Sequence, residues 1–245
     1  MNETIKTLLN HRSIREFKNT KLTNEQVNCI IQSAQQASTS SYMMAYTIIG
    51  VTAPQIKAAL AEVSGQSYVK NNGHLLVFCA DLHRQTHTAS QGMFNQMIEN
   101  LENSEHFLVS AIDAALAAQN AAIAAESMGL GICYLGSLRN DLARVDELLS
   151  LPQHVIPLFG MAVGVPAHQP ERKPRLPKSA VYFENKYEAH DDIVQAFDDK
   201  IASYYQTRSE NSRKDTWTAQ MHRRFSKTIR MDVTDLVQKK GFNKR

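Results

Sequence analysis

The sequence predicts an α+β fold, in which a few buried strands pack against helices. Two short apolar runs, at residues 45–51 and 75–80, are rich in Ile, Val and Phe, as expected of strands covered on both faces. A longer segment at 106–128 is rich in alanine and apolar nearly all round, which predicts a long central helix. Further strand patterns lie at 131–136 and 156–165.

Local signals place the ends of the helices between these runs. Residues 3–9 form a short amphipathic turn, and Thr23 with Gln26 forms a capping box that starts a helix. Pro54 marks the first turn of a helix between the first two strands. Gly129 ends the long central helix as its C-cap.

The C-terminal part of the chain differs in charge from the rest. Beyond about residue 191 the pattern is helical and basic, and residues 205–245 hold 11 basic and 4 acidic side chains, whereas the remainder is net negative. We expect one domain over residues 1–245 with a basic helical excursion over about 191–245.

Composition excludes several classes of protein. The chain has 245 residues, of which 43% are hydrophobic and 21% charged, so it is neither disordered nor fibrous. Its three cysteines, Cys29, Cys79 and Cys133, form no C-x-x-C pair, which favours a reducing compartment. No apolar run approaches the ~18 residues of a membrane span, so we expect a cytoplasmic protein without a membrane partner.

The strong catalytic and nucleotide signatures are missing. Residues 129–134 begin like a dinucleotide fingerprint but end in Tyr134 instead of glycine, and there is no P-loop. His83 and His87 have helical spacing but no third ligand nearby, so we predict a solvated pair and no metal site. Nucleophile motifs are also absent, and we assign no catalytic side chain.

What remains is a scattered set of cations and hydroxyls in loops. Guanidinium groups and hydroxyls suit a phosphate, which needs several charge-assisted donors, although a solvated basic loop is the plainer interpretation of any single cluster. The set consists of Arg12, Ser13, Arg15, residues 38–41, Gln66, Lys173 and Arg175.

Resemblance to a known family favours the phosphate interpretation. The chain resembles the oxygen-insensitive NADPH-dependent nitroreductases and NADPH flavin oxidoreductases in six blocks that occur in the same order: His11-Arg12-Ser13-Ile14-Arg15, 121–131, 134–140, 151–160, 173–177 and 213–217. The resemblance implies a nitroreductase-like α+β fold with a central, mainly antiparallel sheet and surrounding helices. It also implies an intertwined homodimer with one FMN per subunit.

The resemblance also assigns site residues. Arg12 is expected on the flavin phosphate and Arg15 near the pyrimidine edge of the ring, while the cluster at 38–41 reaches the site from the partner subunit. Ser137 stands where a second glycine is common in the family. The expected flavin contacts are His11, Arg12, Ser13, Arg15, Ser38, Thr39, Ser40, Gln66, Tyr68, Tyr134, Leu135, Gly136, Ser137, Lys173 and Arg175. The expected NADPH and substrate contacts are Ser41, Tyr42, Arg139, Arg208 and Arg230.

The implied activity moves two electrons from NADPH by a ping-pong mechanism to nitroaromatic, quinone or flavin acceptors. Because FMN carries the chemistry, no general base is needed. The alternatives are an NADPH:FMN reductase that supplies reduced flavin or reduces disulfide or chromate, and a non-catalytic flavin-binding protein. Nucleic-acid binding by the basic tail is disfavoured, because the tail has few aromatic residues and no recognised motif.

Overall fold

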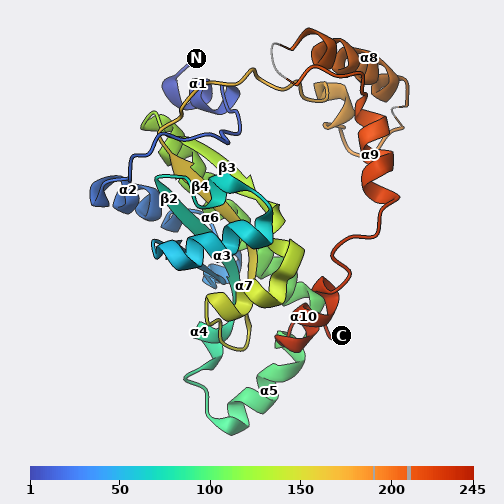
Figure 1. Cartoon of the computed structure of the whole chain (residues 1–245). Helices are drawn as coiled ribbons and strands as arrows, with labels where there is room; N and C mark the ends of the chain where they lie inside the picture. Colours follow the sequence, from blue (N-terminus) through green and yellow to red (C-terminus); the bar gives the residue numbers. More distant parts are fainter. Residues whose placement is uncertain (190, 209–210) are drawn as a thin grey trace. The chain divides into compact units, whose positions relative to one another are not determined.

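The structure, a computed structural model, describes residues 1–189, 191–208 and 211–245. The chain divides into two compact units (Figure 1). The first comprises Met1–Pro170 with Arg230–Arg245, and the second comprises Glu171–Ile229.

The first unit is built on a four-stranded sheet in the order β1-β2-β4-β3, in which every neighbouring pair is antiparallel. The strands are β1 (Tyr46–Val51), β2 (His74–Asp81), β3 (Gly131–Leu135) and β4 (Val155–Gly164). All four were predicted from the apolar runs, and the mainly antiparallel sheet that the resemblance implied is confirmed. The expectation of burial on both faces holds for β2, whereas β1 lies at the sheet edge and is partly exposed in the chain.

Helices surround this sheet. Those of the first unit are α1 (Glu3–Leu9), α2 (Asn24–Gln35), α3 (Pro54–Ser64), α4 (His83–Thr86), α5 (Gln91–Leu101), α6 (Ser104–Ser127), α7 (Leu142–Leu148) and α10 (Val233–Lys239). Single 3₁₀ turns are η1 (Ser40–Tyr42), η2 (Ser67–Val69) and η3 (Gly136–Asp141). The predicted capping box of Thr23 and Gln26 at α2 and the proline at the start of α3 are both present.

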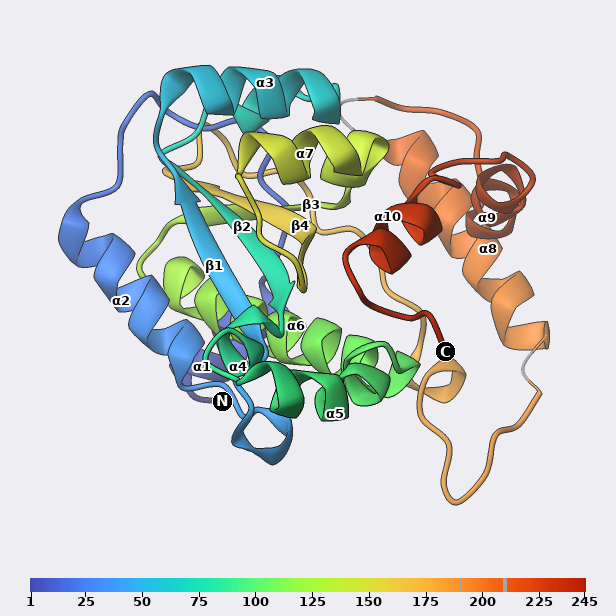
Figure 2. The same ribbon diagram turned by 90° about the horizontal axis from the view of Figure 1, so that it is seen from below.

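The helices cover both faces of the sheet (Figure 2). On one face α2 and α6 contribute Ile30, Ala34 and the buried alanines of α6 to a core shared with Phe78 and Met161. On the other face α3 and α7 pack their apolar side chains against the opposite side of the strands. The sheet therefore lies between two helical layers within this unit.

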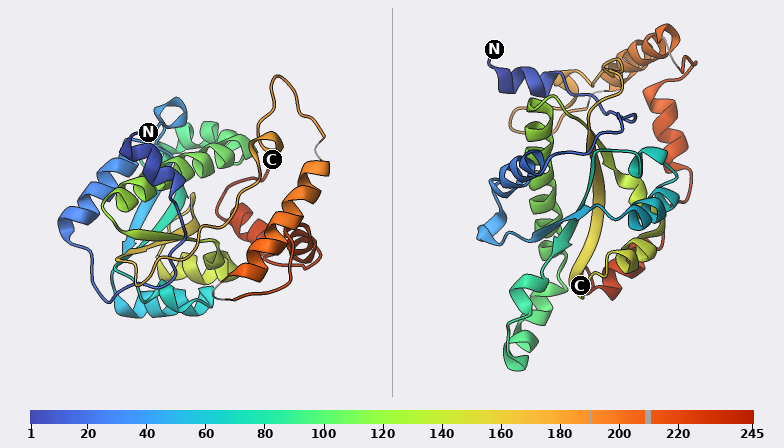
Figure 3. Two further views of the ribbon diagram at one scale, coloured as in Figure 1. Left: turned by 90° about the horizontal axis from the view of Figure 1, so that it is seen from above. Right: turned by 60° about the vertical axis from the view of Figure 1, so that its left-hand side comes forward.

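Helix α6 runs along the sheet (Figure 3), and its alanines allow close approach. It is long and apolar enough to cross a membrane by length and composition, although polar residues interrupt its sequence. Ser110 and Asp113 are fully buried in the protein, and one face of the helix packs on the strands, as in the core helix of a globular fold. The opposite side carries exposed Leu108, Ile112 and Leu116.

The end of the chain returns to the first unit. Helix α10 contributes Leu236 and Val237 to a third apolar cluster, in which Phe242 has no exposed surface. Lys240 is buried, and its Nζ lies 2.7 Å from Oδ1 of Asp146 on α7. Helix α10 and Phe242, which lie in the basic segment, thus belong to the core of the first unit. The single-domain organisation stays a prediction.

The second unit holds α8 (Asp191–Thr207), α9 (Trp217–Phe225) and the 3₁₀ turn η4 (Lys178–Ala180). Its small core consists of Phe197, Ile201 and Tyr205, with Leu176 and Trp217 packed against them. The helical pattern predicted beyond residue 191 corresponds to α8 and α9.

Candidate functional site

The cationic segment at 11–15 lies along strand β3. The Ile14 amide donates to the Ile132 carbonyl at 2.8 Å, and the Ile14 side chain is only 3% exposed. A Cβ on Gly131 would lie 2.4 Å from Ile14 Cγ1, so glycine is needed for this approach. Because successive side chains of an extended segment point to opposite sides, burial of Ile14 directs Ser13 and Arg15 away from the core.

His11 contacts the end of α6, and Arg12 lies beside it on the wall of a cavity. His11 Nδ1 lies 2.7 Å from Oε1 of Glu126. The Arg12 guanidinium donates to the side chain of Asn10 and, at 3.4 Å each, to Gln169 Oε1 and the Pro170 carbonyl. Arg12 and Glu126 line a cavity of about 150 Å³. Arg12 is therefore oriented by neutral oxygen atoms and has no carboxylate partner within the described part of the chain.

Two of the segments expected to contact the flavin, around Arg15 and around Tyr68, come together beside β3. The Arg15 guanidinium lies close enough to the Tyr68 hydroxyl to lower its pKa, and the Cys133 Sγ lies 4.0 Å from the same oxygen. Burial, followed by the effect of Cys133, raises the pKa of Tyr68, and burial raises the pKa of the Cys133 thiol. Both groups are therefore neutral near pH 7. Gln66 is exposed and directly precedes η2.

The end of β3 contacts α6, and the turn that follows β3 contacts α3. Ser137 and Ser64 share a hydrogen bond of 2.7 Å between their hydroxyls. The Tyr134 hydroxyl donates to the Ala118 carbonyl at 2.9 Å, and burial raises the Tyr134 pKa. Leu135 is buried, while a Cβ on Gly136 would approach the Arg139 guanidinium to 3.2 Å.

Two of the predicted NADPH contacts lie on or beside η3. Arg139 donates to the Leu158 carbonyl at 2.5 Å. Arg230, with a φ of +56°, donates to Asn140 Oδ1 through Nε at 3.0 Å and Nη2 at 2.8 Å. Both arginines therefore already make contacts that fix their direction.

The remaining predicted cations belong to the second unit. Arg208 lies over the Tyr204 ring at 5.6 Å, and Arg175 donates to the Lys173 carbonyl at 2.7 Å. Lys173 and Arg213 lie 5.6 and 4.1 Å from the centre of the Tyr205 ring. Burial would raise the pKa of Tyr205, but the hydrogen bond from Lys173 and the two positive charges lower it. Lys173, Arg175 and Arg208 thus share one small unit.

The polar cluster at 38–42 leads into a backbone with unusual torsion angles. Ser41, Tyr42 and Met44 have φ values of +49°, +58° and +47°, a region that non-glycine residues enter rarely. This backbone conformation costs about 1 kcal/mol of free energy per non-glycine residue. It persists only where the surrounding structure holds the backbone in place. Tyr42 is 83% exposed at the tip of this loop.

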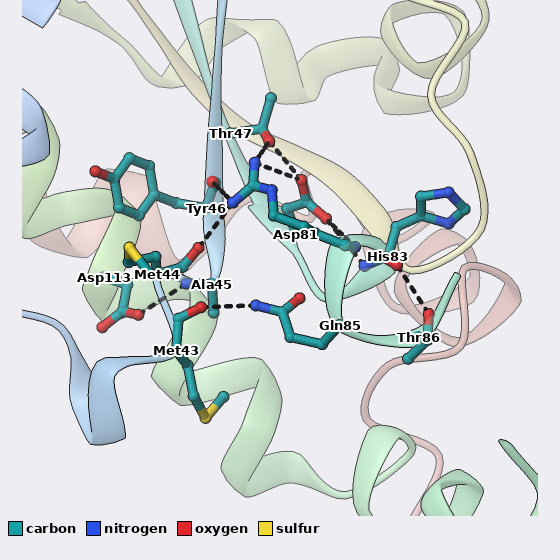
Figure 4. A network of polar contacts seen from close by, with 11 residues as sticks. Met43, Met44, Ala45, Tyr46, Thr47, Asp81, His83, Gln85, Thr86 and Asp113 are labelled. Atoms are coloured by element: carbon teal, nitrogen blue, oxygen red, sulfur yellow. Dashed lines mark hydrogen bonds and ion pairs between the residues drawn. The ribbon is translucent and has the colours of Figure 1, made fainter. Parts of the chain in front are cut away.

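Three side chains hold the loop (Figure 4). Both carboxylate oxygens of buried Asp113 accept backbone N–H groups at 3.0 Å, from Ser40 and from Ala45. Arg84 donates to the Met44 carbonyl at 3.2 Å, and Gln85 donates to the Met43 carbonyl at 2.7 Å. The loop is therefore fixed from α6 on one side and from α4 on the other.

The histidine pair considered as a metal site lies on and just after α4. The rings of His83 and His87 stack with centres 5.7 Å apart and an interplanar angle of 10°. Within residues 1–189, 191–208 and 211–245, no group of three or more His, Cys, Asp or Glu side chains is placed to hold a metal ion.

Comparison with known proteins identifies the family. Residues 8–165 match the nitroreductase family and residues 173–245 match its C-terminal domain. The chain belongs to the nitroreductase family. It is 51% identical over 249 residues to an FMN reductase (NADPH) of Bacillus subtilis, with both chains fully covered. It is 44% identical over 241 residues to an NADPH-dependent oxidoreductase of Staphylococcus epidermidis, with 96% of each chain covered.

Solved structures agree with this nitroreductase assignment. The NfrA1 nitroreductase from B. subtilis has a TM-score of 0.92 and 50% identity, covering 99% of this chain and 100% of that one. An NADPH:FMN oxidoreductase from Vibrio harveyi complexed with NAD+ has a TM-score of 0.89 and 38% identity, with both chains fully covered. The nitroreductase-like fold expected from the sequence is confirmed.

Several residues around the candidate site were missed by the sequence analysis. They are Ser64, Arg84, Gln85, Asp113 and Cys133. One of them carried a signal, because Asp113 is an acidic residue inside an otherwise apolar segment. Such a residue must find partners when buried, and here its partners are the backbone amides of the loop.

Proposed function

We propose that this protein is an FMN-containing oxidoreductase that moves two electrons from NADPH to small-molecule acceptors. One observation carries the proposal: Arg12, Arg15, Tyr68 and Ser137 gather around β3 in a chain that matches NADPH-dependent flavin reductases over its whole length. Nitroaromatic compounds, quinones and free flavin are the acceptors that we propose.

The residues present fit a flavin mononucleotide. The donor set combines guanidinium groups suited to a phosphate with hydroxyl groups suited to ring oxygens and nitrogens. A Cβ at Gly136 would approach the Arg139 guanidinium to 3.2 Å, so glycine keeps a side chain away from the backbone after β3. FMN, when bound, supplies the redox chemistry by accepting two electrons from NADPH and passing them to the acceptor.

Each part of the chain then has a role in binding and orientation. Arg12, preoriented by Asn10 and Gln169, would bind the phosphate, while His11 and Ser13 flank it. Lys173 and Arg175, which belong to the second unit, are further proposed flavin contacts. Arg15, placed by Tyr68, would put a positive charge beside the electron-rich edge of the ring. The set from Tyr134 to Ser137 and Gln66 would line the remaining edges.

We assign selection of NADPH to arginines. The 2′-phosphate distinguishes NADPH from NADH, and a planar guanidinium can bind it bidentately. Arg208, Arg139 and Arg230 are the proposed contacts. Because one pocket would hold donor and acceptor in turn, ping-pong kinetics are expected.

The proposed assembly is an intertwined homodimer. Exposed Leu108, Ile112 and Leu116 form a stripe on α6 that a second copy would cover. The loop with Ser38, Thr39, Ser40, Ser41 and Tyr42 would then reach the partner's flavin and substrate pocket. We also propose a cytoplasmic location, which the three free cysteines support.

A flavin acceptor is specifically favoured by one relative, whose name is FMN reductase (NADPH). Steady-state rates with a panel of FMN, quinone, nitroaromatic, disulfide and chromate acceptors separate the proposals. A rate with free FMN well above the others supports flavin supply as the main activity.

The cofactor assignment is tested by the colour of the purified protein and by an arginine variant. The wild type is expected to be yellow with FMN as the released chromophore, and NADPH should bleach it. Arg12→Ala removes a charge-assisted contact and should weaken FMN binding about tenfold to a hundredfold in a fluorescence titration. Arg144→Ala, which removes an exposed arginine paired with Glu62, is the matched control. Equal FMN affinity in both variants would contradict the role of Arg12.

A further inference from the structure

A second cavity, of about 530 Å³, lies in the first unit. Its walls come from the segment before and at the start of α2, from the end of β1 and start of α3, and from the turn that precedes β2. Three lysines line it, Lys21, Lys57 and Lys70. None of the described residues that line it belongs to the proposed flavin or NADPH contacts.

Positive charge is concentrated on the wall of this cavity, and no acidic side chain among the described residues of that wall neutralises it. No aspartate or glutamate is among its lining residues, and within the described part of the chain none of the three ammonium groups lies within 4.0 Å of a carboxylate. Burial, and then the charge of Lys21, lowers the pKa of Lys57. Burial, and then the charge of Lys57, lowers the pKa of His74 on the same wall. A bound anion would relieve this repulsion between like charges.

One lysine is oriented toward the cavity by a fixed partner. Lys57 Nζ donates to Asn72 Oδ1 at 2.8 Å. The Asn72 amide nitrogen in turn donates to the carbonyls of Tyr68 and Val69 at 2.8 and 2.9 Å, so the direction of Asn72 is set by backbone. Such preorganisation lowers the entropy lost when a ligand binds. Asn19, Asn24 and Asn71 add neutral donors and acceptors on the wall.

We propose that this cavity binds the phosphate group of a small phosphorylated metabolite. Three cations suit the charge of a phosphate, and their separate elements can each donate to a different phosphate oxygen. The asparagines and the half-buried apolar side chains of Leu22 and Val27 offer surface to the body of the ligand. The volume lies within the range of small-molecule sites, which favours a metabolite over an extended polymer.

The test uses the FMN-loaded full-length protein without NADPH and inorganic pyrophosphate as the probe. Lysines are acetylated with limiting acetic anhydride, and the modification at each site is quantified by mass spectrometry. Pyrophosphate should slow labelling of Lys21, Lys57 and Lys70 severalfold and leave exposed Lys239 on α10 unchanged. Citrate at matched ionic strength separates phosphate recognition from general anion binding.

A calorimetric titration with variants completes the test. Lys57→Gln should weaken pyrophosphate binding about tenfold, whereas Lys239→Gln, with the same loss of charge, should leave it unchanged. The FMN content of both variants is expected to equal that of the wild type, which separates this cavity from the flavin site. Protection of Lys239 to the same degree, equal protection by citrate, or an unchanged affinity in Lys57→Gln would overturn the proposal.

Discussion

Asp113 is an acidic residue with no exposed surface inside the largely apolar helix α6. Its two oxygens accept amides at both ends of a loop in which three non-glycine residues have positive φ. An isolated buried carboxylate is costly, and hydrogen bonds from backbone amides stabilise its charged form. We infer that Asp113 fixes the loop that presents Ser41 and Tyr42.

Replacing this carboxylate by an amide tests the role of Asp113. In Asp113→Asn, an NH2 group replaces one of the two acceptor oxygens and cannot accept a hydrogen bond. One backbone N–H therefore loses its charge-assisted hydrogen bond and is left without an acceptor. The free energy of unfolding should fall by about 1.5–3 kcal/mol. The amides of Ser40 and Ala45 should exchange faster with solvent, as measured by hydrogen–deuterium exchange, and the KM for the acceptor should rise more than kcat changes.

Ser110→Ala is the control for this substitution, because Ser110 is equally buried and its hydroxyl donates to the His106 carbonyl of the same helix. The control should leave exchange at Ser40 and Ala45 unchanged. Unaltered protection of these amides in Asp113→Asn would show that the loop is held by Arg84 and Gln85 alone.

At the scale of secondary-structure elements, the two sides of helix α6 differ in burial. Its alanines pack on the sheet, whereas Leu108, Ile112 and Leu116 are 54%, 55% and 44% exposed, although they are among the largest apolar side chains of the helix. Their spacing of four residues places them on one stripe. An exposed stripe of this kind is typical of a protein–protein interface.

A charge on this stripe should weaken the proposed homodimer. In Ile112→Glu, association would bury an unpaired carboxylate, so light scattering should detect a shift from dimer to monomer at micromolar concentration. The monomer fold should survive, because Ile112 is exposed within the chain. Gln96→Glu adds the same charge on exposed α5 and should remain dimeric. A monomeric wild type with full flavin content would refute the interface.

Much of this level of structure could be predicted from the sequence. The strands, the capping box at Thr23 and the proline at the start of α3 depend on local patterns, and all of them are present. The exposure of β1 and of the α6 stripe could not be predicted from the sequence. Apolar periodicity shows that a side chain needs to be buried, but it does not show whether the same chain or another one covers it. The contribution of Phe242 to the core was missed because the surrounding sequence is basic.

At the scale of the whole molecule, positive charge is concentrated near the C-terminus. The resemblance to the family assigned Arg12, Arg15 and Tyr68 to one site, and the structure brings Arg15 and Tyr68 together. Spacing in the sequence alone could not have done so, since these residues come from the segment before α2 and from η2. Lys173, Arg175 and Arg208 lie in the second unit, and their role at the flavin and at NADPH stays a prediction.

The preference for NADPH over NADH tests whether Arg208 in this basic region binds the 2′-phosphate. Arg208→Ala removes a guanidinium that rests on the Tyr204 ring, and it should raise the KM for NADPH about tenfold to a hundredfold in steady-state assays. The KM for NADH should barely change, because NADH lacks the 2′-phosphate, and kcat should change little. Arg224→Ala, at an exposed position on α9, controls for the loss of one positive charge.

High salt should weaken NADPH binding more in the wild type than in Arg208→Ala, because salt screens the contact that the variant lacks. Equal losses with both nicotinamides would assign Arg208 to the fold or the pyrophosphate, and no loss with either would transfer the 2′-phosphate to Arg139 or Arg230.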